Sequence, residues 1–209
     1  MLKKIILALA VIIALPLIAA LFLKTHYSVV RSITVERPNA QVFDYIKHLK
    51  NQDNFSKWAM MDPDMKKTYR GEDGMAGFVS AWASENPDVG VGEQEIIKIT
   101  PNERVDFELR FLSPFEATEP AYMSTKPVSD TSTQVDWGFS GHMDYPMNLM
   151  LAVMDFETMI GNDLQEGLNN LKQVLEAKPV KESLPEPVEP EVFDSLEEQA
   201  APLELKAAH

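Results

Sequence analysis

The sequence contains no cysteine among its 209 residues. Disulfide bonds, cysteine-ligated zinc or iron–sulfur centres and thiol nucleophiles are therefore excluded, as is membrane attachment through an acylated cysteine. Basic residues are also few: 19 Lys and Arg stand against 32 Asp and Glu, for a net charge of −13. A nucleic-acid groove needs basic side chains to replace the counterions of the phosphates, so we expect no nucleic-acid partner.

The motifs of metal, nucleotide and hydrolase sites are missing as well. The histidines have no metal-ligand spacing, and no HExxH occurs. The glycines at 71, 74 and 77 and the Gly90-Val-Gly92 string do not match the dinucleotide fingerprint and favour turns or close approach of strands. The string Gly138–His142 is not G-x-S-x-G. The sequence therefore predicts no metal site, no cofactor and no catalytic residue of these classes.

One long uncharged run, Ile5–Leu23, follows two lysines near the start of the chain. A helix of its 19 residues covers roughly 28 Å, close to the hydrocarbon core of about 30 Å. The alternative is a cleaved secretory signal, whose apolar region usually has about 7–15 residues before a small-x-small cleavage site. No Ala-x-Ala occurs between Ala14 and Thr25. We expect residues 1–24 to be an uncleaved anchor that contacts the membrane through residues 5–23.

Charges around this run predict its orientation. Lys3 and Lys4 favour leaving the amino end in the cytoplasm, whereas Lys24 and Arg31 weaken the asymmetry. The interpretation is a single-pass protein of a bacterial inner membrane, with its soluble domain on the periplasmic or extracytoplasmic side.

Residues 25–176 have the pattern of one α+β domain. A Val-, Ile- and Thr-rich strand over Tyr27–Glu36 ends at Pro38, and Asn39 begins a helix, followed by a short helix or turn over 51–58. The apolar period then changes to two, which predicts strands over Lys66–Arg70, Gly77–Ala83, Val91–Thr100, Arg104–Leu112, Phe115–Lys126 and Thr133–Gly141.

The strand over Arg104–Leu112 alternates most regularly. Val105, Phe107, Leu109 and Phe111 share one face, which indicates an antiparallel sheet with one covered face. The cover is an amphipathic helix over Met147–Glu176, which we expect to break near Gly161-Asn162. Residues 177–209 are rich in proline and acidic residues without periodicity and have the composition of a disordered tail.

Several strings in this order resemble the SRPBCC superfamily (START-like; polyketide cyclase/dehydrase and lipid transport), in particular its bacterial membrane-anchored members. They are Arg31-Ser-Ile-Thr-Val, Val42-Phe43-Asp44-Tyr45-Ile46, Thr100-Pro-Asn-Glu-Arg104, Trp137-Gly-Phe-Ser-Gly141 and Gly167-Leu-Asn-Asn-Leu171. Glu36-Arg37 departs from the apolar-small pair that often precedes the first proline. The resemblance covers about residues 27–175. It implies a helix-grip fold: a curved antiparallel sheet around a long carboxy-terminal helix, with a hydrophobic cavity between them, and no single activity.

On this fold the apolar and aromatic residues facing the last helix are the candidate ligand contacts. We predict that Phe107, Trp137, Met150 and Met154 line the cavity, together with Trp82 and Tyr122. The predicted function is membrane-tethered binding of a lipid or another small hydrophobic molecule.

Two other functions stay open from the sequence. A cyclase or dehydratase would need an inward acid–base group, and Glu93 and Glu95 are its candidates, because a carboxyl group in an apolar cavity has a raised pKa. A ligand-free module could instead recruit a partner through the acidic tail or the outer face of the sheet. The sequence favours binding over catalysis without deciding between them.

Overall fold

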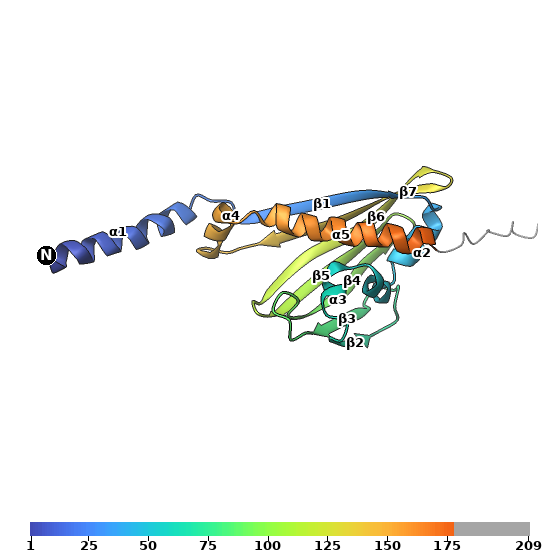
Figure 1. Cartoon of the computed structure of the whole chain (residues 1–209), viewed down its shortest axis with the longest axis horizontal. Helices are drawn as coiled ribbons and strands as arrows, with labels where there is room; N and C mark the ends of the chain where they lie inside the picture. The colour runs from blue at the N-terminus through green and yellow to red at the C-terminus, as the bar shows by residue number, and fades with distance from the viewer. Residues whose placement is uncertain (178–209) are drawn as a thin grey trace, which may run out of the picture. The chain divides into compact units, whose positions relative to one another are not determined.

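The computed structural model describes residues 1–177 (Figure 1). The helices are α1 (Leu2–Ala20), α2 (Asn39–Ile46), α3 (Lys57–Met61), α4 (Met150–Val153) and α5 (Phe156–Ala177), with short 3₁₀ helices η1 (Leu49–Asn54) and η2 (Met147–Leu149). The strands are β1 (His26–Val35), β2 (Lys66–Arg70), β3 (Val79–Ala83), β4 (Val91–Thr100), β5 (Arg104–Ser113), β6 (Ala117–Ser129) and β7 (Ser132–His142). The tail predicted as disordered, and any partner it would recruit, lie outside the described residues.

One antiparallel sheet holds all seven strands in the order β1-β7-β6-β5-β4-β3-β2. The first and last segments of the domain lie together, because β1 pairs with β7 and α5 packs against β1 (Figure 1). Helix α5 crosses one face of the sheet, and α2, η1 and α3 lie on that same side (Figure 1). This is the helix-grip fold that the resemblance implied.

The covered face is formed by the predicted alternate residues. In β5, Val105 and Phe107 are fully buried, whereas the side chains of Glu108 and Arg110 lie on the other face. The turn between β4 and β5 centres on Asn102, which has the positive φ of 60° that asparagine tolerates better than most residues. Leu164, Leu168, Leu171 and Leu175 of α5 complete the core against the sheet.

The predicted break in the last helix is misplaced. Gly161 lies within continuous α5, and the helix instead restarts after Met154, whose backbone is extended. The carboxylate of Asp155 accepts a hydrogen bond from the Thr158 backbone N–H at 3.0 Å, so Asp155 caps the new helix. Gly161 leaves room for the guanidinium of Arg31 from β1, which a Cβ there would displace.

Helix α1 has the length and hydropathy needed to cross a membrane and is essentially unburied by the rest of the protein. Its carboxy-terminal carbonyls have a specific partner in the domain. The buried side chain of Asn148 in η2 donates to the backbone oxygen of Ala20 at 2.7 Å. Five residues, 21–25, separate the end of α1 from the start of β1.

Candidate functional site

A cavity of about 270 Å³ lies between the sheet, α5 and the η1–α3 segment. Apolar residues dominate its lining: Leu49, Trp58, Ala59, Met65, Trp82, Val89, Leu109, Phe111, Ala121, Trp137, Phe139, Ile160 and Leu164. The polar lining residues are Gln52, Asp53, Ser56, Lys67, Ser80, Asp88 and Gln94. The volume is just below the roughly 300–1,000 Å³ typical of small-molecule pockets, so the cavity suits one compact ligand.

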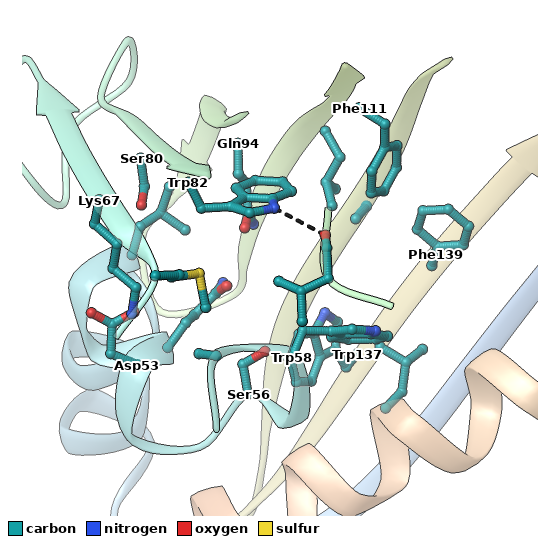
Figure 2. A pocket seen from close by; sticks show the side chains of 18 of the residues that line it. Asp53, Ser56, Trp58, Lys67, Ser80, Trp82, Gln94, Phe111, Trp137 and Phe139 are labelled. Carbon is teal, nitrogen blue, oxygen red and sulfur yellow. Dashed lines mark hydrogen bonds and ion pairs between the residues drawn. The ribbon is translucent and has the colours of Figure 1, made fainter. Parts of the chain in front are cut away.

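The three tryptophans of the chain, Trp58, Trp82 and Trp137, all line this cavity (Figure 2). Two glycines make room for their rings. A Cβ at Gly92 would lie 2.7 Å from the Trp82 ring, and one at Gly167 would lie 2.7 Å from the Trp137 ring. Both expectations for the Gly90-Val-Gly92 string hold: Gly90 has a positive φ of 65°, and a Cβ at Gly92 would also lie 2.7 Å from the Arg110 backbone oxygen of β5.

Aromatic contacts fix the orientation of these rings. Trp137 meets Trp58 edge-on with ring centroids 6.3 Å apart, and Trp82 meets Phe111 in the same manner at 6.3 Å. The indole N–H of Trp82 donates to the backbone oxygen of Val89 at 3.2 Å (Figure 2). This bond holds the β3–β4 loop over the cavity.

The η1–α3 segment covers the cavity and is held by polar contacts. The Lys57 ammonium lies 2.8 Å from the Asp163 carboxylate and 3.0 Å from that of Glu166, both on α5. These carboxylates raise the pKa of Lys57, so the ammonium stays charged. At the far end, the Ser84 hydroxyl donates to the Asp62 carboxylate. The cover is thus fastened to α5 and to β3.

Five of the seven polar lining residues come from η1 and from the neighbouring strands β2, β3 and β4. Lys67, Ser80 and Gln94 occupy inward positions of β2, β3 and β4, and Ser80 lies opposite Gln94 in the strand register. The Lys67 ammonium pairs with the Asp53 carboxylate at 2.8 Å. Figure 2 shows Lys67, Asp53 and Ser80 on one side of the cavity and the rings of Phe111, Phe139, Trp58 and Trp137 on the other, with Gln94 beside Trp82 between them.

The structure separates the six residues predicted as ligand contacts. Trp82 and Trp137 lie on the cavity wall, as does Ile160 of α5. Phe107 is 2% exposed and belongs to the closed core rather than to the wall. Met150 lies in α4 outside the cavity, and Met154 lines a separate hollow beside Lys24 and Phe156. The break at Asp155 explains the methionines, because it turns α4 away from the stripe of α5.

Tyr122 lies on the outer face of the sheet. Its neighbours in β6, Ala121 and Met123, are buried on the inner face, so alternation directs Tyr122 outward. There the Arg104 guanidinium lies 3.7 Å from the centre of its ring. Tyr122 was assigned to the cavity because it is aromatic, but the alternation of inward and outward residues along β6 determines which face it occupies.

The carboxylates of Glu93 and Glu95 also point away from the cavity. Both pair with the Arg110 guanidinium at 2.7 Å, and Arg70 and Arg110 lower the pKa of Glu93. The two candidates for the acid–base group of a cyclase or dehydratase therefore do not face the cavity, because Gln94 between them takes the inward phase.

An inward carboxylate that the sequence reasoning missed is Glu119 of β6. It is 8% exposed, accepts a hydrogen bond from the His142 backbone N–H at 2.8 Å, and burial raises the pKa of its carboxyl. Its alternation with Ala121 and Met123 was the available signal. Glu119 does not line the described cavity. Tyr27 lies near Glu119, and its ring contacts the ring of Phe139 on the cavity wall, with centroids 6.1 Å apart.

Comparison with known proteins agrees with this architecture. Residues 26–176 match the family described as "Polyketide cyclase / dehydrase and lipid transport". The chain belongs to this family. The match begins at the first residue of β1 and ends one residue before α5 does, so it spans the sheet and the gripping helix and leaves α1 outside. A search of curated proteins finds no match.

Solved structures support the fold. A protein from Mesorhizobium loti superposes with a TM-score of 0.53 at 13% identity, over 74% of this chain and 100% of its own. DynU16, a protein in the dynemicin biosynthetic locus, superposes with a TM-score of 0.50 at 11% identity, over 72% of this chain and 47% of its own. Identities this low establish a common fold, and the family as a whole includes both catalysts and carriers by its description.

Proposed function

We propose that the protein is a membrane-tethered binding protein that takes up one small hydrophobic molecule, such as a lipid, in the cavity between the sheet and α5. The observation that carries this proposal is a cavity of about 270 Å³ bordered by all three tryptophans. Close packing is the rule in protein interiors, where voids larger than a water molecule are few. A space of this size that the surrounding side chains leave unfilled supports the uptake of a ligand.

The tether is α1, together with the end of the domain where β1 begins. Apolar side chains are exposed at that end, in the β5–β6 turn (Phe115, 75%) and in α4 (Val153, 82%). Exposed apolar groups next to a membrane-spanning helix are stabilised by the interfacial region of a bilayer. Trp82, Phe111 and Ile160 lie toward this end of their elements, so the cavity extends toward the side from which a lipid would arrive.

Ligand uptake is tested on the full chain in dodecyl maltoside. Organic extraction followed by mass spectrometry should recover an apolar molecule, and N-phenyl-1-naphthylamine should quench the tryptophan emission in the delipidated protein. Ala59→Phe places a ring into the cavity from α3 and should abolish quenching, because Ala59 lines the wall. Gln165→Leu on α5, outside the lining, is the matched control. Absence of both a recovered molecule and Ala59-dependent quenching would refute the proposal.

Anchoring needs its own experiment. Mass spectrometry of the membrane-extracted protein should find the segment before Lys24 still attached; a mature chain starting near residue 21–25 would instead identify α1 as a cleaved signal. Because the sequence has no cysteine, Lys126→Cys gives one labelling position on the exposed end of β6. A membrane-impermeant maleimide should label it in intact spheroplasts if the domain is extracytoplasmic, and only after lysis otherwise.

A cyclase or dehydratase activity has one observation in its favour, the Lys67–Asp53 pair on the cavity wall. Glu93 and Glu95 no longer support it. If the protein were such an enzyme, Asp53→Asn would abolish turnover of a bound ligand while leaving its uptake intact. A ligand recovered unchanged after prolonged incubation with the wild-type protein would contradict catalysis.

A further inference from the structure

The polar side of the cavity contains side chains whose hydrogen-bonding groups are unused. Within residues 1–177, the side chains of Ser80 and Gln94 make no hydrogen bond, and the amide nitrogen of Gln52 is buried without a partner. A buried donor without a partner destabilises the folded protein, since it has lost its bonds to water. The buried Gln52 nitrogen and the two partly exposed side chains of Ser80 and Gln94 border one cavity, which indicates that the missing partner is a ligand.

The charges on the lining determine what kind of polar group fits. Lys67 is the one basic residue of the described lining, and its ammonium is already paired with Asp53. Asp88 adds a second carboxylate, so the lining carries one positive and two negative charges. An anionic head group would lose its hydration without gaining a free cation, which is unfavourable in a largely apolar site. A neutral oxygen can instead accept hydrogen bonds from amide and hydroxyl donors.

The opposite wall determines the rest of the ligand. Phe111, Phe139, Trp58 and Trp137 face the polar side across the cavity (Figure 2). Flat aromatic walls about a compact space favour a ring system over a long flexible chain, because rings give large contact area with little loss of conformational entropy.

We propose that the ligand is a compact, uncharged ring compound carrying a carbonyl, ester or hydroxyl oxygen, which Gln52, Ser80 and Gln94 bind while its rings lie on the aromatic wall. This deepens the proposed function and rests on it. It distinguishes neutral oxygenated ring compounds from fatty acids, which are hydrophobic but end in a carboxylate.

The test compares three naphthalenes that differ in a single group: 2-(dimethylamino)naphthalene, its 6-propionyl ketone and its 6-carboxylate. Each is titrated into the full chain in dodecyl maltoside, with quenching of the cavity tryptophans as the readout and the Ala59→Phe protein as the blank for micelle partitioning. The ketone should bind about five- to tenfold more tightly than the parent compound, and the carboxylate about tenfold or more weakly than the ketone.

A double variant tests the residues that make this selection. Gln52→Leu with Gln94→Leu should reduce the affinity for the ketone to that of the parent compound, whose own affinity should stay equal or rise. Gln165→Leu should leave all three affinities unchanged. The selectivity of the wild-type protein decides the proposal even if the double variant does not fold.

The outcomes separate this inference from the proposed function. Equal affinity for the three compounds, or preference for the carboxylate, would overturn the neutral-ligand inference while leaving ligand uptake established. A ketone preference that survives the double variant would overturn the assignment to Gln52 and Gln94. Failure of all three compounds and of N-phenyl-1-naphthylamine to quench would refute the proposed function itself, and this inference with it.

Discussion

Replacing either of two phenylalanines on the same strand should separate the roles of core and cavity. Phe107 and Phe111 both point inward from β5, four residues apart. Phe107 is 2% exposed and lies between Ile96 and Ala121 in the strand register, within the closed core. Removing its ring leaves a new void, so Phe107→Ala should lower the free energy of unfolding by about 3–5 kcal/mol.

Phe111 is partly exposed and already borders the cavity. Its ring loses the contact with Trp82 and part of its buried area, so Phe111→Ala should lower the free energy of unfolding by only about 1–2 kcal/mol. The effect on ligand uptake should have the opposite order, with a larger loss of affinity for naphthyl probes in the Phe111 variant than in the Phe107 variant.

The assay is urea unfolding of the full chain in dodecyl maltoside, followed by far-UV circular dichroism, with tryptophan quenching measured on the same preparations. Helix α1 contributes a constant signal to both variants, which makes their difference a property of the domain. A Phe111 variant that is the less stable of the two, with probe binding affected more by Phe107→Ala, would refute this assignment of wall and core.

Two further predictions concern α5 and Glu119. Gly167→Ala should lower the free energy of unfolding by about 1–3 kcal/mol and shift the tryptophan emission, because the new Cβ meets the Trp137 ring at 2.7 Å. Gly161→Ala should cost less, since the flexible end of Arg31 can move and alanine favours the helix; equal costs would contradict the argument. Burial raises the pKa of Glu119 above its ordinary 4.5, so the native state holds its proton more tightly than the unfolded chain. The stability of the wild type relative to Glu119→Gln should therefore fall as pH rises from about 4.5 through the raised value, and a relative stability that increases with pH would be contrary evidence.

The fold was predictable because its strands carry their own signals. In β5, apolar and polar residues alternate, and this pattern assigned Val105 and Phe107 to the covered face. The same pattern is expected in any strand that has one face in solvent and one face covered. The same rule, applied to β6, would have directed Tyr122 outward and Glu119 inward. Strand phase was more informative than residue type at these two positions.

The position of the helix break and most of the cavity cover depend on long-range contacts. Gly161 is typical of a helix terminus by composition, yet it lies within α5, where it faces the guanidinium of Arg31 from β1. Gln52 and Trp58 belong to short segments with weak local signals, and the contacts of Lys57 with α5 bring this region over the sheet. Contacts between residues about a hundred positions apart, such as that of Lys57 with Asp163, leave no periodic pattern in the sequence.

The cavity is maintained against the tendency of the core to close. Gly92 and Gly167 give up strand and helix preference, a loss of about 0.5–1 kcal/mol each relative to alanine, and in exchange they seat two indoles at the edge of an unfilled space. Ser80 and Gln94 present polar groups to that space without partners among residues 1–177, where apolar residues would have packed more favourably. The polar side chains lower the stability of the empty protein and the glycines give up backbone preference, and all four positions border the cavity or seat its indoles. A ligand in this cavity would return the lost contacts and hydrogen bonds. The proposed ligand would then complete the folded core, and its uptake should stabilise the domain as measured by unfolding.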